Sequence, residues 1–202
     1  MRIVVAITGA SGTAYGVRFV ERAAAAGASI DLIVSAAGAR VAQDELGFDL
    51  DPTRGEFAQR LGEHASCVRR VPLHDIGAEC ASGSVPFHGM AIVPCSMGTL
   101  GRVAAGLASN LIERAADVQL KERRPLVIVP RETPLNRIHL ENLLRVHDAG
   151  AVVLPAMPAF YTGATTVAEL IDTVVDRALA PFFGPDAIRS RWVPPRRAGG
   201  DS

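Results

Sequence analysis

The sequence predicts an α/β fold in which a doubly wound parallel sheet lies between two layers of helices. Three observations predict this class. Short apolar runs recur along the chain and contain almost no polar residues, as expected for strands that are buried on both faces. Helical patterns separate these runs, and such alternation of strand and helix favours parallel pairing. Turns rich in glycine and serine follow several of the runs.

Five apolar runs are expected to be strands, and four segments between or after them are expected to be helices. The first helix should end at Gly27 and the last before Pro181, because glycine favours helix ends and proline lacks the backbone N–H. The expected strands are Ile3–Ile7, Ile30–Val34, Met90–Val93, Leu126–Val129 and Ala151–Leu154. The expected helices are Tyr15–Ala26, Leu111–Arg123, Leu135–Ala149 and Thr166–Leu179.

The segment Gly47–Pro72 is more polar and less periodic than its surroundings. We expect a turn there, a short helix around Gly55–Glu63 and an excursion at one edge of the sheet. Residues 1–188 are expected to form a single domain, which suits a chain of 202 residues. The tail, residues 189–202, is rich in proline and glycine and should be partly extended, with a disordered end.

The composition excludes several classes of partner. Lys and Arg together number 21, and so do Asp and Glu, so no overall charge favours nucleic acid or an anionic membrane. No apolar run approaches the length that spans a membrane. The three cysteines form neither a disulfide framework nor a zinc-binding pattern, which suits a reducing compartment. We therefore expect a soluble, cytoplasmic protein.

The first candidate site is the loop T-G-A-S-G, Thr8–Gly12, which follows the first strand and opens the first helix. Small residues there let backbone N–H groups approach a phosphate, with the positive end of the helix behind them. Gly9, Ala10 and Ser11 are the expected contacts. The structural alternative is a tight turn in which Ser11 caps the helix.

A second loop repeats this arrangement after the strand Met90–Val93. Its sequence is P-C-S-M-G-T, and Ser96 and Thr99 each offer a hydroxyl beside several N–H groups. Two such loops at the carboxyl edge of one sheet indicate a ligand with a phosphate and a polar ring. Ser35 ends the second strand and either joins this site or only caps the next helix.

Charged residues and a tyrosine add candidates for holding an anion or moving a proton. Arg131 and Glu132 follow the strand Leu126–Val129, where an arginine holds phosphate and a glutamate transfers protons. The alternative for Glu132 is a helix cap near Pro134. The other candidates are Arg114, Lys121, Tyr161 and Arg177, each of which is commonly an ordinary surface or edge residue when taken singly.

Metal and thiol chemistry find little support in the sequence. The five histidines have no spacing typical of metal ligands. Cys95 lies in the second loop without a recognisable histidine partner, so we interpret it as a small buried residue.

Taken together, these blocks resemble the UbiX/Pad family of flavin prenyltransferases, within the superfamily of flavin-containing cysteine decarboxylases. The similarity runs from about Arg2 to Trp192. The long block E-R-A-A-D-V-x-L-K-E-R-R-P-L-V-x-V-P-R-E-T-P is its most specific part. T-G-A-S-G, P-C-S-x-x-T and the pair Phe160–Tyr161 support it.

The resemblance implies a flavodoxin/Rossmann-like sheet, reduced FMN bound at a subunit interface, and a homododecamer. It implies that a dimethylallyl group passes from dimethylallyl phosphate to N5 and C6 of reduced FMN without a metal. The product would serve a partner decarboxylase. The implied FMN contacts are Gly9, Ala10, Ser11, Ser35, Ser96, Met97, Gly98, Thr99 and Arg131. The implied donor contacts are Arg114, Lys121, Tyr161, Arg177 and Trp192, and the implied catalytic residues are Ser11, Glu45, Lys121 and Glu132, with Arg114 and Lys121 reaching the site from a neighbouring subunit.

The chain differs from the family pattern at one place, and two other functions are considered. Some family members carry a tryptophan in the prenyl pocket where this chain has the aliphatic stretch around Ile76, which bears on donor choice. A flavin-dependent cysteine decarboxylase is disfavoured, because Gly98 and Pro158 stand where that class has asparagines. A non-enzymatic FMN carrier would have no need of Lys121, Glu132 and Arg177 together.

Overall fold

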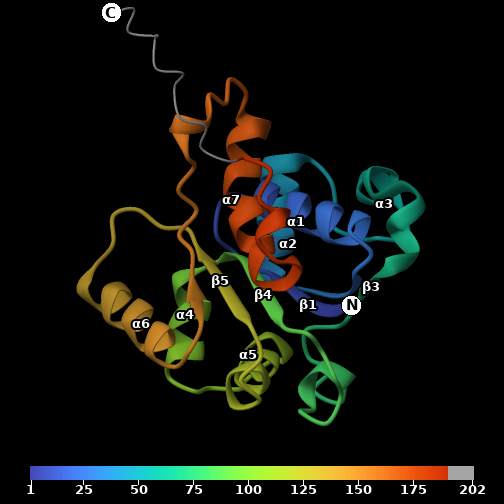
Figure 1. Cartoon of the computed structure of the whole chain (residues 1–202). Coiled ribbons are helices and arrows are strands. Elements are labelled where there is room, and N and C mark those ends of the chain that lie inside the picture. The colour runs from blue at the N-terminus through green and yellow to red at the C-terminus, as the bar shows by residue number, and fades with distance from the viewer. Residues whose placement is uncertain (191–202) are drawn as a thin grey trace, which may run out of the picture.

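The computed structural model describes residues 1–190, and in this part of the chain one six-stranded parallel sheet forms the centre (Figure 1). The strand order is β3-β2-β1-β4-β5-β6, so the chain winds outward from β1 to one edge and from β4 to the other. This confirms the predicted doubly wound α/β class. The strands are β1 Arg2–Ile7, β2 Ser29–Val34, β3 Val68–Arg70, β4 Met90–Cys95, β5 Leu126–Pro130 and β6 Val152–Val153.

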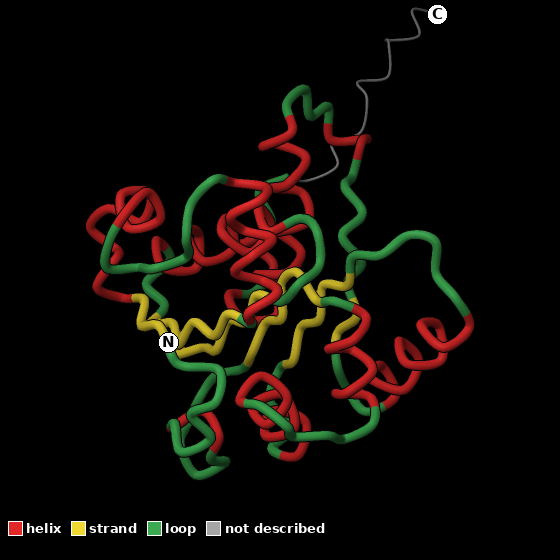
Figure 2. The backbone as a smooth tube through the Cα atoms, turned by 180° about the vertical axis from the view of Figure 1, so that it is seen from behind, coloured by secondary structure: helices red, strands yellow, loops and turns green. Residues whose placement is uncertain are grey.

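Helices cover both faces of the sheet (Figure 2). The α1 and α7 helices pack together on one face, and α4 packs with α5 and α6 on the other. The helices are α1 Thr13–Ala25, α2 Ala36–Leu46, α3 Gly55–Leu61, α4 Met97–Ala104, α5 Leu111–Lys121, α6 Arg137–Asp148 and α7 Val167–Phe183. Short 3-10 turns are η1 Gly62–Cys67, η2 Glu79–Ala81, η3 Phe160–Thr162 and η4 Pro185–Ala187.

Two apolar cores lie on opposite faces of the sheet. Ile3, Val5 and Ile7 of β1 pack toward α1 and α7, whereas Val4 and Ala6 pack toward α4 and α5. Successive side chains of a strand point to opposite faces, so a strand between two helix layers must be apolar at every position. This explains the unbroken apolar runs from which the fold class was predicted.

Two elements differ from the sequence expectation. The strand β3 lies in the polar segment Gly47–Pro72, and it was missed because two of its three residues, Arg69 and Arg70, are exposed at the sheet edge. The predicted end of the last helix before Pro181 was wrong, since α7 continues to Phe183. Phe182 meets the ring of Phe19 edge-on at 6.1 Å, so packing against the core holds this last turn.

The single-domain boundary at residue 188 stays a prediction, and residues 191–202 of the tail lie outside the described residues. Among residues 1–190, no helix combines the length and apolar character needed to cross a membrane.

Candidate functional site

The carboxyl ends of four neighbouring strands bring most of the predicted site residues to one edge of the sheet. We call this set the loop edge. The strands are β1, β2, β4 and β5, and they are adjacent in the sheet. The loop edge consists of Gly9, Ala10, Ser11 and Gly12, with Ser35, Ser96, Met97, Gly98, Thr99 and Arg131.

The glycines of the first loop are required by its backbone. Gly12 has a φ of 101°, a left-handed conformation that strains residues with a side chain. A Cβ atom on Gly9 would lie 2.5 Å from the Cβ of Ala37 at the start of α2. The loop therefore packs closely against α2, and its last residue, Gly12, lies at the start of α1.

Thr8 ties the two loops of this edge together, a role that the sequence analysis missed. Its hydroxyl donates to the carbonyl of Pro94 at 3.0 Å and accepts the N–H of Ser96 at 2.7 Å. The side chain is completely buried. A threonine between an apolar strand and a glycine is an ordinary turn residue, so only the contact across the sheet reveals its function.

Glu45, from the last turn of α2, places its carboxylate on the start of α1. It accepts the N–H of Gly12 at 3.0 Å and that of Thr13 at 2.9 Å. Burial raises the pKa of Glu45, but hydrogen bonds from Ser11, Thr13 and Gly12 outweigh it and the pKa is lowered overall. The start of α1 thus binds an oxyanion, as the chemistry of a helix N-terminus favours, and Glu45 occupies the N–H groups of Gly12 and Thr13.

The structural alternative for Ser11 was wrong, because the residue at the cap position of α1 is Gly12 and no side chain caps the helix from there. The alternative for Ser35 is what the structure shows, since its Oγ accepts the N–H of Gly38 at 3.0 Å. Ser96 caps α4 and donates its hydroxyl to that of Thr99 at 3.1 Å. Both serines therefore have structural roles that fix the loops at this edge.

Arg131 connects the far end of the loop edge to the first loop. Its Nε donates to the carbonyl of Ser11 at 3.1 Å. Within residues 1–190, its two terminal nitrogens make no hydrogen bond or ion pair, so they are available to a ligand. Tyr15 lies near enough for the charge of Arg131 to lower the pKa of its hydroxyl, although burial raises that pKa more strongly.

A second contact missed by the sequence analysis lies behind the second loop. Arg102 forms an ion pair with Glu113, whose side chain is fully buried. Arg102 also reaches the hydroxyl of Thr99 at 3.4 Å. Burial raises the pKa of Glu113, yet hydrogen bonds from Arg102 and from the Ser109 backbone lower it overall. This pair links α5 to the loop that carries Ser96 and Thr99.

Tyr161 and Arg177 line a separate cavity of about 310 Å³, which we call the Tyr161–Arg177 cavity. Arg177 is on α7, one helical turn after Thr173, and Tyr161 is in η3. Within residues 1–190, no carboxylate pairs with the Arg177 guanidinium. The remaining lining residues are Leu154, Pro155, Met157, Pro158, Ala159, Thr173, Val174 and Ser190.

Arg114 and Lys121 lie on α5 and contact other parts of the chain. Arg114 donates to the carbonyl of Ala81 at 3.1 Å and pairs with Asp117. Lys121 pairs with its neighbour Glu122. Among the described residues, no hydrogen bond or ion pair connects either cation to the loop edge or to the Tyr161–Arg177 cavity.

Three further predicted residues have simpler outcomes. Glu132 is exposed and accepts the N–H of Thr133 at 3.0 Å, whereas Asn136 caps α6, so the alternative role of Glu132 as a helix cap was wrong. Trp192 lies outside the described residues. Cys95 is buried as expected, and burial raises the pKa of its thiol to about 12, which keeps it protonated.

The comparisons with known proteins agree with this geometry. A family model described as Flavoprotein matches residues 1–179. A protein named flavin prenyltransferase UbiX from Halalkalibacterium halodurans is 45% identical over 188 residues, which cover 93% of this chain and 91% of that protein. The chain belongs to the flavoprotein family, among the UbiX flavin prenyltransferases. The Pseudomonas aeruginosa UbiX is 43% identical over 95% of this chain and 93% of its own length.

Solved structures of UbiX relatives show the same fold. A crystal structure of AnUbiX (PadA1) in complex with FMN and dimethylallyl pyrophosphate superposes with a TM-score of 0.83 at 38% identity, covering 96% of this chain and 97% of that chain. A dodecameric FMN-dependent UbiX-like decarboxylase from Escherichia coli O157:H7 has a TM-score of 0.80 at 36% identity, covering 90% and 94% of the two chains. A PPC decarboxylase shares only the fold, at 18% identity.

Proposed function

We propose that this protein is a flavin prenyltransferase that joins a dimethylallyl group from dimethylallyl phosphate to N5 and C6 of reduced FMN. The observation that carries this proposal is the pairing of two anion-binding regions in a chain that matches UbiX enzymes over nearly its whole length. One region is the loop edge with Arg131, and the other is the Tyr161–Arg177 cavity.

FMN is proposed to bind at the loop edge. Backbone N–H groups and short hydroxyl side chains there suit both a phosphate and the polar edge of the flavin ring. The terminal nitrogens of Arg131 add charge-assisted hydrogen bonds. Bound reduced FMN would supply the nucleophile of the reaction, while Ser11 and the ionised Glu45, which are hydrogen-bonded at the start of α1, would orient it and accept a proton.

The donor phosphate is proposed to bind in the Tyr161–Arg177 cavity. Arg177 and the Tyr161 hydroxyl stabilise the negative charge that develops on the departing phosphate. Glu132 is proposed to pass to the departing phosphate a proton that the bond formation on reduced FMN releases. Trp192, which lies outside the described residues, is proposed for the same site because of the resemblance to the family.

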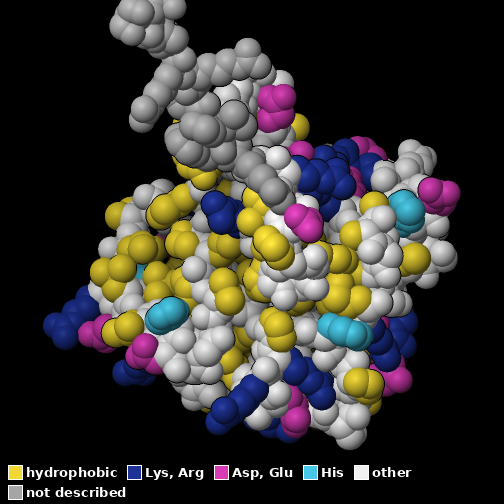
Figure 3. All heavy atoms as spheres, in the orientation of Figure 1, with side chains coloured by type: hydrophobic (Ala, Val, Ile, Leu, Met, Phe, Trp, Pro, Cys, Tyr) yellow, Lys and Arg dark blue, Asp and Glu magenta, His cyan; other side chains and the backbone are white. Residues whose placement is uncertain are grey.

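Arg114 and Lys121 are proposed to complete this site from a neighbouring subunit. This agrees with their contacts within their own chain, where Arg114 binds the Ala81 carbonyl and Lys121 pairs with Glu122. Several cations of this kind neutralise a monophosphate without a carboxylate-bound metal. We propose a homododecamer, the state named for the E. coli relative. Large exposed apolar side chains support subunit contacts, including Ile138 and Leu144 of α6. Figure 3 shows hydrophobic side chains gathered over much of one face of the molecule.

The proposal also covers the prenyl donor and the decarboxylase that receives the product. Ile76 is 67% exposed in the single chain, so a neighbouring subunit would have to cover it before it could line a prenyl pocket. The AnUbiX relative was crystallised with dimethylallyl pyrophosphate, so both the monophosphate and the pyrophosphate must be tried as donors. The product is proposed to serve a decarboxylase in the cytoplasm.

The direct test is to incubate the protein anaerobically with reduced FMN and dimethylallyl phosphate and to weigh the extracted flavin. We expect a flavin heavier by one five-carbon unit. Unmodified flavin with both donors would contradict the proposal and would favour an FMN carrier instead. A parallel incubation with oxidised FMN controls for adducts that form without the electron-rich ring.

A further inference from the structure

The walls of the Tyr161–Arg177 cavity include two segments that α7 holds in place. One is the stretch that follows β6 and contains Pro155 and Ala159. The other is the stretch that follows η4 and contains Ser190. Leu154 and Ala156, at the start of the first segment, donate their N–H groups to carbonyls of β5, and side chains of α7 bind both segments further along.

Thr173 fastens the first of these segments. Its hydroxyl accepts the N–H of Ala159 at 3.0 Å and donates to the carbonyl of Leu170 at 2.7 Å. Thr173 is 4% exposed, so both bonds are sheltered from water. The loop that leads to Tyr161 is thereby held against α7.

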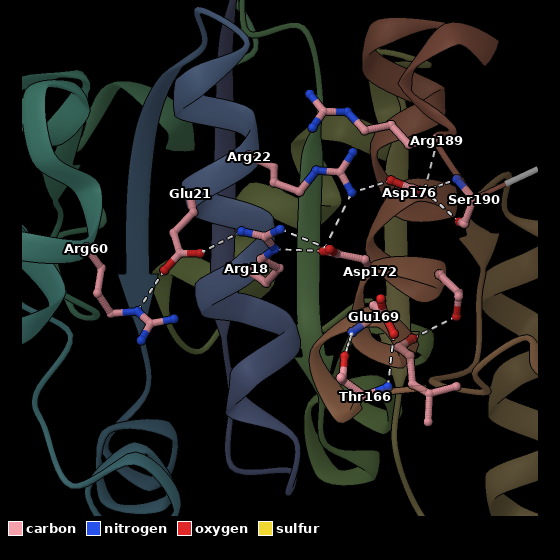
Figure 4. A network of polar contacts seen from close by, with 12 residues as sticks. Arg18, Glu21, Arg22, Arg60, Thr166, Glu169, Asp172, Asp176, Arg189 and Ser190 are labelled. Atoms are coloured by element: carbon pink, nitrogen blue, oxygen red, sulfur yellow. Dashed lines mark hydrogen bonds and ion pairs between the residues drawn. The ribbon is translucent and has the colours of Figure 1, made fainter. Parts of the chain in front are cut away.

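Asp176 fastens the second segment, as Figure 4 shows. One carboxylate oxygen accepts the N–H of Arg189 at 2.9 Å, the N–H of Ser190 at 2.7 Å and the hydroxyl of Ser190 at 2.6 Å. The other oxygen pairs with Arg22 of α1, and the guanidinium of Arg22 also reaches the carbonyl of Ala187 at 3.4 Å.

The Asp176 contacts form a buried clamp. The side chain of Asp176 is 1% exposed and that of Arg22 is 9% exposed. A buried carboxylate is tolerated only when hydrogen bonds and an opposite charge satisfy it. Burial alone raises the pKa of Asp176, but the bonds from Ser190 and Arg22 outweigh it and lower the pKa overall. The clamp is therefore closed and charged at neutral pH.

Thr173 and Asp176, which hold the two segments, lie close to Arg177 on α7. Thr173 lies three residues before Asp176 and four before Arg177 on α7, so it neighbours both on the helix surface, whereas Asp176 and Arg177 follow each other and point in different directions. Ser190 and Thr173 line both the Tyr161–Arg177 cavity and an adjoining polar cavity of about 330 Å³. One helix thus sets both walls and the charge of the cavity.

We propose that Asp176 is a positioning residue for the donor site of the proposed prenyltransferase, acting through Ser190 and Arg22. Its clamp fixes the segment around Ser190 as a wall beside Arg177 and so sets the fit of a small allylic phosphate. This inference rests on the proposed function for the identity of the ligand, whereas the clamp itself is a property of the fold.

The experiment compares Asp176→Asn with Asp172→Asn in the FMN-loaded full chain. Asp172 is the matched control, because it lies one turn earlier on α7 and pairs with Arg18 and Arg22 but makes no hydrogen bond to Ser190. Asp176→Asn should raise the Kd and the KM for dimethylallyl phosphate about tenfold, equivalent to one lost contact of moderate strength. The turnover number at saturating donor and the FMN affinity should stay within about twofold of wild type, a ratio too small to report a lost contact.

Hydrogen exchange supplies a readout that does not depend on activity. The amides of Arg189 and Ser190 should exchange faster in Asp176→Asn and at the wild-type rate in Asp172→Asn. Unchanged exchange in Asp176→Asn would show that the clamp does not hold the segment. Faster exchange with an unchanged donor Kd would show that the segment does not shape the donor site.

Ser190 variants keep the proposal testable if Asp176→Asn does not fold. Ser190→Ala removes one of the three bonds without stranding a buried charge, and it should raise the donor Kd less, in the same direction. Ser190→Thr retains the hydroxyl and should restore wild-type binding. Equal donor binding by the alanine and threonine variants would overturn the inference. Failure of the proposed function would look different, since wild type would then yield no prenylated flavin while the exchange results stood.

Discussion

The loop edge and the Tyr161–Arg177 cavity are built by different means. At the loop edge, backbone N–H groups and short side chains lie within a few residues of strand ends, and Thr8 joins the two loops directly. At the cavity, the walls are segments outside the strand ends, and side chains of α7 and α1 hold them, as Asp176 does with Arg22 and Ser190. The ligand-facing groups of the proposed flavin half therefore follow directly from strand ends, whereas the proposed donor half depends on side-chain contacts between elements and on proposed quaternary contacts.

Loss of the cavity's cation should give the largest effect. We expect Arg177→Gln to reduce kcat/KM for prenyl transfer by about 100-fold or more, because charge stabilisation of a leaving phosphate is worth several kcal/mol. FMN affinity should be unchanged. Initial rates of product formation at varied donor concentration measure this.

Arg137→Gln is the matched control for this change, because Arg137 is an exposed arginine on α6 whose one ion pair within residues 1–190 is with Glu141. It should leave kcat/KM at the wild-type value. If Arg177→Gln weakened FMN binding and left donor kinetics intact, the division between the two regions would be wrong.

Loss of Arg131 at the loop edge should weaken FMN binding, which loss of Arg177 should leave unchanged. We expect Arg131→Gln to weaken FMN binding about 30-fold, because hydrogen bonds from a charged donor contribute roughly 1.5–3 kcal/mol. Fluorescence quenching of FMN on binding measures this. An unchanged Kd for FMN would place the flavin elsewhere in the molecule.

A pair of glycine variants separates backbone strain from ligand binding. Gly12→Ala and Gly27→Ala both force a side chain into a left-handed conformation, with φ of 101° and 82°, at a cost of roughly 1–2 kcal/mol of stability. Gly12→Ala should cost more, because its Cβ would lie 2.9 Å from the ring of Tyr15. Only Gly12 lies in the loop that presents N–H groups, so only Gly12→Ala should also weaken FMN binding. Urea unfolding and FMN titration on both variants test this, and equal FMN affinity in the two would contradict it.

The smallest expected effect is a change in pH dependence at Glu45. Its pKa in the folded protein is lowered, so its contribution to stability is complete above its ordinary pKa of about 4.3 and is lost as the pH falls through the folded pKa. Glu45→Gln should lower stability slightly at pH 7 and flatten the loss toward pH 3. Urea unfolding over this range measures it, with Glu63→Gln, an exposed acid on η1, as the control. An unchanged acid limb in Glu45→Gln would show that Glu45 is not ionised on the α1 start.

The same contrast explains what the sequence could predict. The strands that carry the loop edge were predicted because burial on both faces demands unbroken apolar runs, as in Ile3–Ile7. Arg131 was predicted because a residue after a strand must lie at the ligand-facing edge. Thr8, Arg102 and Asp176 were missed because each acts through a partner that is distant in sequence or on another element. The strand β3 was missed because an edge position does not require apolar residues.

Subunit mixing tests most directly whether the proposed donor site needs a residue from a neighbouring subunit. Arg177→Gln and Lys121→Gln chains, each expected to be inactive alone, would be co-expressed with different tags and purified through both. We expect the mixed oligomers to recover prenylated FMN, because some sites combine an intact Arg177 from one chain with an intact Lys121 from another. Arg177→Gln mixed with Tyr161→Phe should give no more product than the two variants give alone, since both residues line one cavity of one chain. Equal recovery by the two mixtures, or none by the first, would contradict a donor site completed by a neighbouring subunit.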